Sequence, residues 1–186
     1  ASGGYETDEV TLAKRILRSK PYFGEKGGVT LSGGEVLCQA EFAAALFRIM
    51  KKEGVHTALD TSGCIMNDSV RELLSLTDLV LLDYKFTDDR AYRDFTGCER
   101  RRVDEFLMYL DENRIPVVIR HVVVPGHTDG EENLVSLEEI VGRYSCITGV
   151  ELLPFRKLCA EKYISAGINF PLADTPETTE EQLRQI

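Results

Sequence analysis

Short apolar runs rich in Val, Ile and Leu alternate along this chain with longer segments in which apolar residues recur at helical spacing. This pattern is typical of strand–helix units around a parallel sheet, because parallel strands need a long crossover that is usually a helix. It predicts five strands, at 29–32, 55–60, 79–84, 117–124 and 150–154. It predicts helices between them at 39–53, 68–76, 102–113 and 133–144, the first ended by Gly54 as a capping glycine.

The two ends of the chain depart from this alternation. A helix at about 7–20 carries an apolar stripe that needs a sheet to cover it, yet no strand precedes it. A last helix is predicted to start near Thr175-Pro176, or at Thr178 with Glu181, and the chain stops at Ile186. We therefore expect one domain over residues 1–186, truncated at its N-terminus and also at its C-terminus.

Composition narrows the classes of function. The 186 residues are 43% hydrophobic, and 22 Lys and Arg stand against 31 Asp and Glu for a net charge of −9. No basic stripe interrupts this balance, so nucleic acid is an unsuitable partner. The sequence has no apolar stretch of the roughly 20 residues that a membrane span needs and no secretory leader, which predicts a soluble, cytoplasmic protein.

The five cysteines are Cys38, Cys64, Cys98, Cys146 and Cys159, at least 13 residues apart. No pair has the spacing of a zinc or iron–sulfur motif, and an odd count argues against a disulfide framework. We expect five reduced thiols that fall in separate connections and do not easily meet.

Polar residues gather where the predicted strands end, which is where parallel α/β sheets and barrels place their sites. The strand ends run into Ser32-Gly33-Gly34-Glu35, Asp60-Thr61-Ser62-Gly63, Asp83-Tyr84-Lys85, Pro125-Gly126-His127-Thr128-Asp129 and Leu153-Pro154-Phe155-Arg156, and Arg120 lies within the fourth strand. Gly33-Gly34 lets a backbone approach a ligand closely, and Glu35 can accept from an amine. A plain turn explains the glycines equally well.

Four further positions suggest a charged ligand. Asp60 and Asp83 end neighbouring strands, so the two carboxylates can converge on a cation, although each can instead cap the segment that follows it. Lys85 shares a pleat face with Asp83 and offers a positive charge to a carboxylate or phosphate. Arg120 sits mid-strand, where a guanidinium needs a partner, which favours the mouth of a barrel. His121 points to the opposite face and is predicted to be structural.

These residues lie in five runs that, in this order, resemble the pyruvate formate-lyase activating enzymes, glycyl-radical activases of the radical S-adenosylmethionine superfamily. The runs are GVTLSGGEVLCQAEF, KKEGVHTALDTSG, TDLVLLDYKFTD, PVVIRHVVVPGHTD and VELLPF. The similarity extends over about residues 4 to 186. It implies a partial parallel (β/α)6 barrel of the radical SAM type, with S-adenosylmethionine bound across the strand ends.

The resemblance also assigns residues. It implies that Gly33, Gly34 and Glu35 receive the amino group of the methionine moiety. It implies that Asp83, Tyr84 and Lys85 contact the ligand, with Lys85 facing its carboxylate, and that Arg120 lines the same mouth. A monovalent cation, Na⁺ or K⁺, is implied at Asp60, Thr61 and Asp83. Arg156 stands where relatives commonly carry a histidine after the Leu-Leu-Pro-aromatic run, and is taken as a ligand contact in its place.

The family's CxxxCxxC loop, which holds a 4Fe-4S cluster, does not occur in this sequence, and the first strand of the barrel is likewise not predicted. In the complete enzyme the resemblance implies that the reduced cluster cleaves S-adenosylmethionine and that the 5′-deoxyadenosyl radical takes a hydrogen from a glycine of the partner. The implied partner is pyruvate formate-lyase, and the implied electron donor is a flavodoxin or ferredoxin. We expect this fragment by itself to be inactive.

Three alternatives stay open at this stage. The chain could serve another glycyl-radical enzyme, because partner choice depends on residues outside these motifs. A lysine at a barrel strand end beside carboxylates is also how Schiff-base aldolases are built, which would make Lys85 the nucleophile. The third alternative is a domain that only binds a ligand or another protein.

Overall fold

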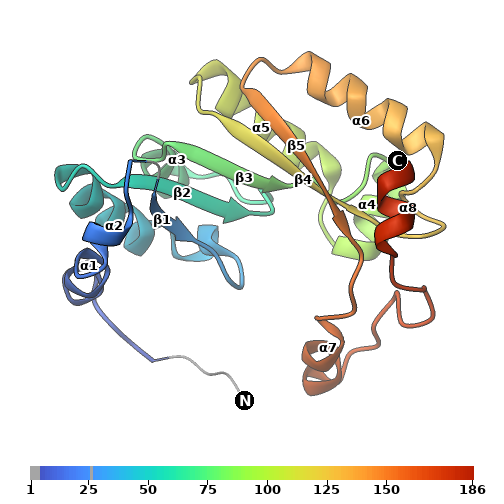
Figure 1. Ribbon diagram of the computed structural model, residues 1–186, viewed down its shortest axis with the longest axis horizontal. Helices are drawn as coiled ribbons and strands as arrows, with labels where there is room; N and C mark the ends of the chain where they lie inside the picture. The colour runs from blue at the N-terminus through green and yellow to red at the C-terminus, as the bar shows by residue number, and fades with distance from the viewer. Residues whose placement is uncertain (1–4, 26) are drawn as a thin grey trace.

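The computed structural model describes residues 5–25 and 27–186 and places five parallel strands in one sheet, in the order β1-β2-β3-β4-β5 (Figure 1). The strands are β1 (Gly28–Leu31), β2 (His56–Thr61), β3 (Leu79–Asp83), β4 (Val117–Val123) and β5 (Ile147–Pro154). All five predicted strands are confirmed, in sequence order and within three residues at each end. The sheet is strongly twisted and open, consistent with the predicted partial barrel.

Strand β4 explains why the sheet has two different faces. Along it Val117, Ile119, His121 and Val123 are buried while the residues between them are half-exposed, as the period of two requires. The buried side packs under the helices. There His121 contacts the Tyr84 carbonyl through Nδ1 at 2.7 Å and lies 3.0 Å from the Asn133 amide, so its predicted structural role is confirmed.

Four helices cover the buried face: α2 (Ala40–Lys52), α3 (Asp68–Leu74), α5 (Arg100–Glu112) and α6 (Glu131–Arg143). Each had been predicted, with slightly different ends. Their apolar stripes join the inward residues of β2, β3 and β4 in one core, which includes Phe47, Leu59, Leu73, Val80, Leu82, Phe106, Leu110, Ile119 and Ile140. Gly54 follows α2 at φ +67, the left-handed conformation of a helix-ending glycine, as predicted.

Helix α1 (Glu9–Leu17) is shorter than predicted and is covered differently. We expected a sheet to bury its apolar stripe, but Ala13 packs against Leu46 and Met50 of α2, with β1 alongside. Val10 stays 47% exposed. The expected partner of α1 was therefore wrong. The apolar side of α2, and not mainly the sheet, covers the apolar stripe of α1.

Several short elements were not predicted. They are α4 (Asp89–Thr96), α7 (Ala160–Ala166) and the 3-10 turns η1 (Lys20–Tyr22) and η2 (Val36–Gln39). The ends of α4 carry ordinary signals, since Asp88 accepts from the Ala91 N–H at 2.7 Å and Gly97 has φ +71. Helix α4 was not predicted because its sequence is mostly polar, and a short helix without a broad apolar stripe has little periodicity to detect.

The last helix, α8 (Glu180–Gln185), starts at Thr179, which forms a capping box with Gln182. Beside it the buried Thr178 hydroxyl donates to the Val123 carbonyl at 2.5 Å, and this fastens the C-terminal segment to the end of β4. None of the helices in the described part of the chain has the length and apolar character needed to cross a membrane.

Candidate cofactor-binding site

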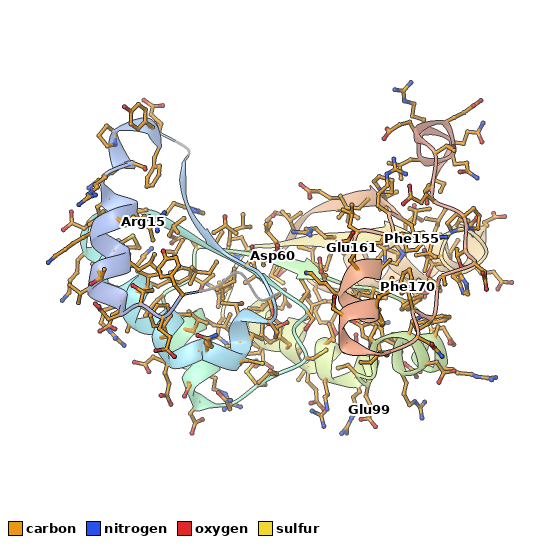
Figure 2. The ribbon with its side chains drawn as sticks, turned by 90° about the horizontal axis from the view of Figure 1, so that it is seen from below. Arg15, Asp60, Glu99, Phe155, Glu161 and Phe170 are labelled. Carbon is orange, nitrogen blue, oxygen red and sulfur yellow. The ribbon has the colours of Figure 1, made fainter. Side chains whose placement is uncertain are left out.

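A cavity of about 300 Å³ lies at the carboxyl ends of β1 to β4. Its lining residues are Gly33, Gly34, Glu35, Asp60, Thr61, Ser62, Asp83, Lys85 and Arg120. They meet because the strands are parallel and in register, with Asp60 opposite Leu81 and Asp83 opposite Arg120. Figure 2 shows Asp60 near the middle of the molecule. Of the predicted ligand and cation positions, all but Tyr84 and Arg156 reach this cavity.

The first wall of the cavity is the turn after β1. Gly33 and Gly34 have φ of +87 and +54, in the left-handed region that disfavours a side chain, and a Cβ on either would meet no atom within 4 Å. Glycine is therefore needed at these two positions for the backbone conformation, and not to make room for a neighbouring atom. Both glycines line the cavity.

Glu35 is held firmly by its protein neighbours. Its carboxylate accepts hydrogen bonds from the Leu37 N–H at 3.1 Å, the Thr61 hydroxyl at 2.6 Å, and the N–H and hydroxyl of Ser62 at 3.0 and 2.6 Å. Burial acts to raise the pKa of Glu35, but the bonds from Ser62, Thr61 and Leu37 outweigh it and lower that pKa below its ordinary value. Glu35 therefore ties the turn after β1 to the loop after β2 and remains ionised at neutral pH.

Ser62 is a site residue that the sequence analysis did not select. It lines the cavity and supplies two of the four donors to Glu35. The chain turns directly after it at Gly63, where φ is +68 and a Cβ would lie 2.8 Å from a Leu82 methyl carbon. A strand end followed by a small polar residue and a glycine was the available signal, but it also fits an ordinary turn.

The two predicted carboxylates do converge, and a guanidinium joins them. Arg120 Nη1 lies 2.9 Å from Asp60 Oδ2, and its Nε lies 3.4 Å from Asp83 Oδ1. On its other oxygen Asp83 pairs with Lys85 Nζ at 2.9 Å. The side chains of Arg120, Asp60 and Asp83 are about one quarter exposed. Arg120 thus finds the partners that a mid-strand guanidinium needs.

The formal charges of the cavity do not cancel. Glu35, Asp60 and Asp83 contribute three negative charges, and Lys85 and Arg120 contribute two positive charges. One net negative charge remains in a hollow partly shielded from water, where electrostatic interactions are stronger than in bulk solvent. The cavity therefore suits a small ligand with a net positive charge that also carries an anionic group for Lys85.

Tyr84 does not line the cavity. Strand alternation turns its side chain to the helix side of the sheet, opposite to Asp83 and Lys85. It is fully buried and its hydroxyl donates to Asp104 at 2.7 Å, while its N–H and carbonyl bond Arg120 and His121. Burial, followed by Asp104, raises the pKa of Tyr84 well above its ordinary range. The expected ligand contact of Tyr84 is thus corrected to a structural role.

Arg156 lines a second cavity, of about 660 Å³, that adjoins the first at Ser62 and Lys85. It lies 3.6 Å from Glu180 and donates to the Thr178 carbonyl, so α8 holds it away from the smaller cavity. Most of the second cavity is apolar, with Phe86, Phe95, Val122, Leu153, Phe155, Phe170 and Leu172 among its lining residues. Figure 2 shows Phe155 and Phe170 close to α7.

Three of the five cysteines, Cys64, Cys98 and Cys159, line the second cavity from three separate connections. No set of three or more His, Cys, Asp or Glu side chains within residues 5–25 and 27–186 is arranged to hold a metal ion. The described thiols thus do not fit a cluster that needs three thiolates.

Comparisons with known proteins agree with this geometry. Residues 2–137 match the Radical SAM superfamily. The chain is 40% identical over 186 residues to the pyruvate formate-lyase-activating enzyme of Clostridium pasteurianum, covering all of this chain and 78% of that protein. It is 35% identical over 187 residues to the pyruvate formate-lyase 1-activating enzyme of Escherichia coli K12, covering 99% of this chain and 76% of that protein.

A solved structure shares the fold. It is a domain of pyruvate-formate lyase-activating enzyme from Bacteroides vulgatus, which superimposes with a TM-score of 0.67 at 22% identity and covers 85% of this chain and 89% of that chain. The sequence matches go further than the fold, because they extend over nearly the whole chain at well above 30% identity. The chain therefore belongs to the radical SAM superfamily and, within it, to the family of the pyruvate formate-lyase-activating enzymes.

Proposed function

We propose that this chain forms the S-adenosylmethionine-binding part of an activase that generates a glycyl radical on pyruvate formate-lyase. Membership of the superfamily implies S-adenosylmethionine and a 4Fe-4S cluster as cofactors. The observation that carries the proposal is the charge of the smaller cavity. S-adenosylmethionine has a sulfonium, an ammonium and a carboxylate, hence one net positive charge, which complements the single net negative charge of the cavity lining.

Each end of the ligand has a suited group in the cavity. Backbone carbonyls at Gly33 and Gly34 receive the ammonium group, and Glu35 adds negative charge beside them. The four donors already on Glu35 occupy about as many lone pairs as a carboxylate offers, so its part is mainly electrostatic. Lys85 and Arg120 face the carboxylate of the ligand, because both carry charges on the same pleat face.

We assign the radical step of the reaction to the larger cavity. It shares Ser62 and Lys85 with the smaller one, so a ligand at the strand ends borders directly on it. Its apolar lining excludes water, which protects a reactive radical from side reactions. We assign it to the glycine-bearing segment of the partner enzyme, with Arg156 at its rim toward α8.

A cluster, when bound, supplies the electron that cleaves the cofactor. The described thiols do not provide its ligands, so this chain by itself is expected to bind S-adenosylmethionine without cleaving it. A monovalent cation at Asp60, Thr61 and Asp83 requires Arg120 to release at least one carboxylate. A flavodoxin or ferredoxin is the proposed electron donor.

The aldolase alternative is not favoured. The chain belongs to a family with a different reaction, and Lys85 forms an ion pair with Asp83.

Calorimetric titration with S-adenosylmethionine tests the binding proposal. Weak binding is expected for the unaltered chain, and Lys85→Ala should weaken it by roughly 1.5–3 kcal/mol through loss of a charge-assisted contact. Lys52→Ala is the matched control, because Lys52 is an exposed lysine of α2 far from the strand ends. Equal binding by the Lys85 and Lys52 variants would remove the basis for the proposed site.

A second assay addresses the radical step. The chain is incubated anaerobically with iron and sulfide, then given a reductant, S-adenosylmethionine and pyruvate formate-lyase. An activase that carries the three-cysteine loop serves as the positive control. The control should release 5′-deoxyadenosine and give a glycyl-radical signal by electron paramagnetic resonance, and this chain should do neither. Release of 5′-deoxyadenosine by this chain would contradict the assignment of its thiols.

A further inference from the structure

The segment that carries Lys85 has left the sheet before it reaches the cavities. Strand β3 ends at Asp83, and residues 84–87 lead from it toward α4. Lys85 lines both the smaller and the larger cavity, and Phe86 lines the larger one. The last residue of β3 in register with β4 is Asp83, opposite Arg120. The positions of Lys85 and Phe86 therefore depend on contacts other than those of the strand ladder.

Both ends of this segment contact one pair of side chains. The Tyr84 carbonyl lies 2.7 Å from Nδ1 of His121. The Thr87 hydroxyl donates to Oδ1 of Asn133 at 2.7 Å. Between these two contacts, Asn133 Nδ2 lies 3.0 Å from His121 Nε2. The four residues thus form a continuous hydrogen-bonded path that leaves the chain just before Lys85 and returns to it shortly after.

Carbonyl groups fix the direction of each hydrogen bond in this path. Asn133 Nδ2 lies 2.9 Å from the Thr128 carbonyl, and a carbonyl can only accept, so this atom is the NH₂ group. The same NH₂ group donates to Nε2 of His121, which must then be the nitrogen without hydrogen. Nδ1 of the neutral ring therefore carries the hydrogen and donates to the Tyr84 carbonyl. Burial lowers the pKa of His121, which favours this neutral form.

The path resists movement of the segment because breaking it leaves a buried group unpaired. The side chain of His121 is fully buried. A shift of the segment would separate the Tyr84 carbonyl from its donor, and a buried polar group without a partner is costly. At the far end of the Lys85 side chain, Nζ lies 2.9 Å from Asp83. Lys85 is therefore held at its charged end and, through its neighbours in the chain, at its backbone.

We propose that His121, Asn133 and Thr87 are positioning residues for cofactor binding, and we call these three the β3 clamp. The clamp fixes the chain on both sides of Lys85, so the ammonium group stands at the smaller cavity before the ligand arrives. Such preorganisation favours binding, because less freedom is lost in the complex. The clamp residues, all within the described ranges, are not part of the smaller cavity's lining, so they act through Lys85. The inference rests on the proposed function, which assigns the ligand carboxylate to Lys85.

A double-mutant cycle with Lys85 tests the clamp. Thr87→Val replaces the hydroxyl by a methyl group of similar size and cuts one end of the path, whereas Thr87→Ser keeps the hydroxyl. In calorimetric titration with S-adenosylmethionine, Thr87→Val should weaken binding about 3- to 10-fold, the usual range for coupled neighbours. In the Lys85→Ala background the same change should have an effect of less than about twofold, because the lysine it positions is gone. Thr87→Ser should bind as the unaltered chain does.

Amide hydrogen exchange, followed by mass spectrometry without any ligand, gives a second readout. Thr87→Val and His121→Phe should both speed exchange in peptides that cover residues 84–87. Thr148→Val is the matched control, because the Thr148 hydroxyl donates to the Val117 carbonyl at 3.0 Å at the opposite end of the sheet. This control should change neither the exchange of residues 84–87 nor ligand binding. If His121→Phe does not fold, the two Thr87 variants carry the test.

The outcomes separate this inference from the proposed function. If Lys85→Ala weakens binding but Thr87→Val does not, the clamp is overturned and the proposed site stands. Equal weakening by Thr87→Val with and without Lys85 would also overturn the clamp, since its effect would not pass through that lysine. If Lys85→Ala binds as tightly as the unaltered chain, the proposed site fails and the clamp inference fails with it.

Discussion

Replacing Glu35 tests whether its carboxylate ties two loops together, independently of any ligand. Glu35→Ala removes the acceptor for two backbone N–H groups, at Leu37 and Ser62, and for two hydroxyls that can turn to water. Leaving a buried donor unpaired costs about 1–3 kcal/mol, and the half-exposed position allows some rehydration. We therefore expect a loss of about 2–4 kcal/mol in the free energy of unfolding, or about 5–15 °C in Tm for a chain of this size.

Glu35→Gln separates charge from shape. Its amide oxygen can still accept from Leu37 and Thr61, but its NH₂ group faces the Ser62 N–H, so we expect a smaller loss of about 1–2 kcal/mol. The lowered pKa of Glu35 adds a pH test. Because the folded state favours the carboxylate, its stabilisation is present above the ordinary value of 4.5 and is lost as pH falls through the lower folded pKa. That acid-dependent part should be missing in Glu35→Gln.

The assay is urea unfolding followed by circular dichroism, without cofactor, across this pH range. Glu105→Ala is the control, since Glu105 is exposed and pairs with Arg101 at 3.7 Å, and its loss should change stability by less than about 0.5 kcal/mol. If Glu35→Ala were as stable as the control, the carboxylate would not tie the loops together. If Glu35→Gln kept the full acid sensitivity, another group would be responsible for it.

Three more outcomes are expected. Gly63→Ala should lower stability by about 2–4 kcal/mol in urea unfolding, because the new Cβ is strained at φ +68 and meets Leu82, and an unchanged midpoint would contradict this. His121 has a pKa lowered by burial, so stability should begin to fall below about pH 6.5, where the unfolded state takes up the proton; His121→Gln should remove that slope. Replacing Na⁺ and K⁺ with tetramethylammonium should weaken S-adenosylmethionine binding in calorimetry if Asp60 and Asp83 hold a cation, and equal binding would refute it.

The sequence by itself determined the strands and most of the helices. A strand that is buried on one face under helices needs apolar residues in every second position. The alternation over Val117 to Val123 therefore predicted β4 and its two faces. The same alternation placed Asp83 and Lys85 on one face and Arg120 at a strand position that required charged partners. Local pattern was sufficient here because each side chain's direction follows from its own backbone.

The sequence could not determine how these groups pair. Arg120 joins Asp60 to Asp83, and Ser62 holds Glu35, only because the register of four strands brings their ends to one point. Tyr84 was assigned to the ligand from its motif, although the alternation that places Asp83 and Lys85 turns it to Asp104. Arg156 was likewise assigned by its position in a run, and the Thr178–Glu180 segment, distant in sequence, decides where it points.

The cysteines mark the limit most clearly. Their spacing excluded a local motif, and the inference that they stay apart followed from spacing alone. Cys64, Cys98 and Cys159 nevertheless line one cavity, because the fold brings together connections that are distant in the sequence. Sequence thus determined what each segment becomes, because strand and helix follow from local periodicity. Only the tertiary structure decided which side chains meet, because that depends on register and on the packing of segments far apart in the chain.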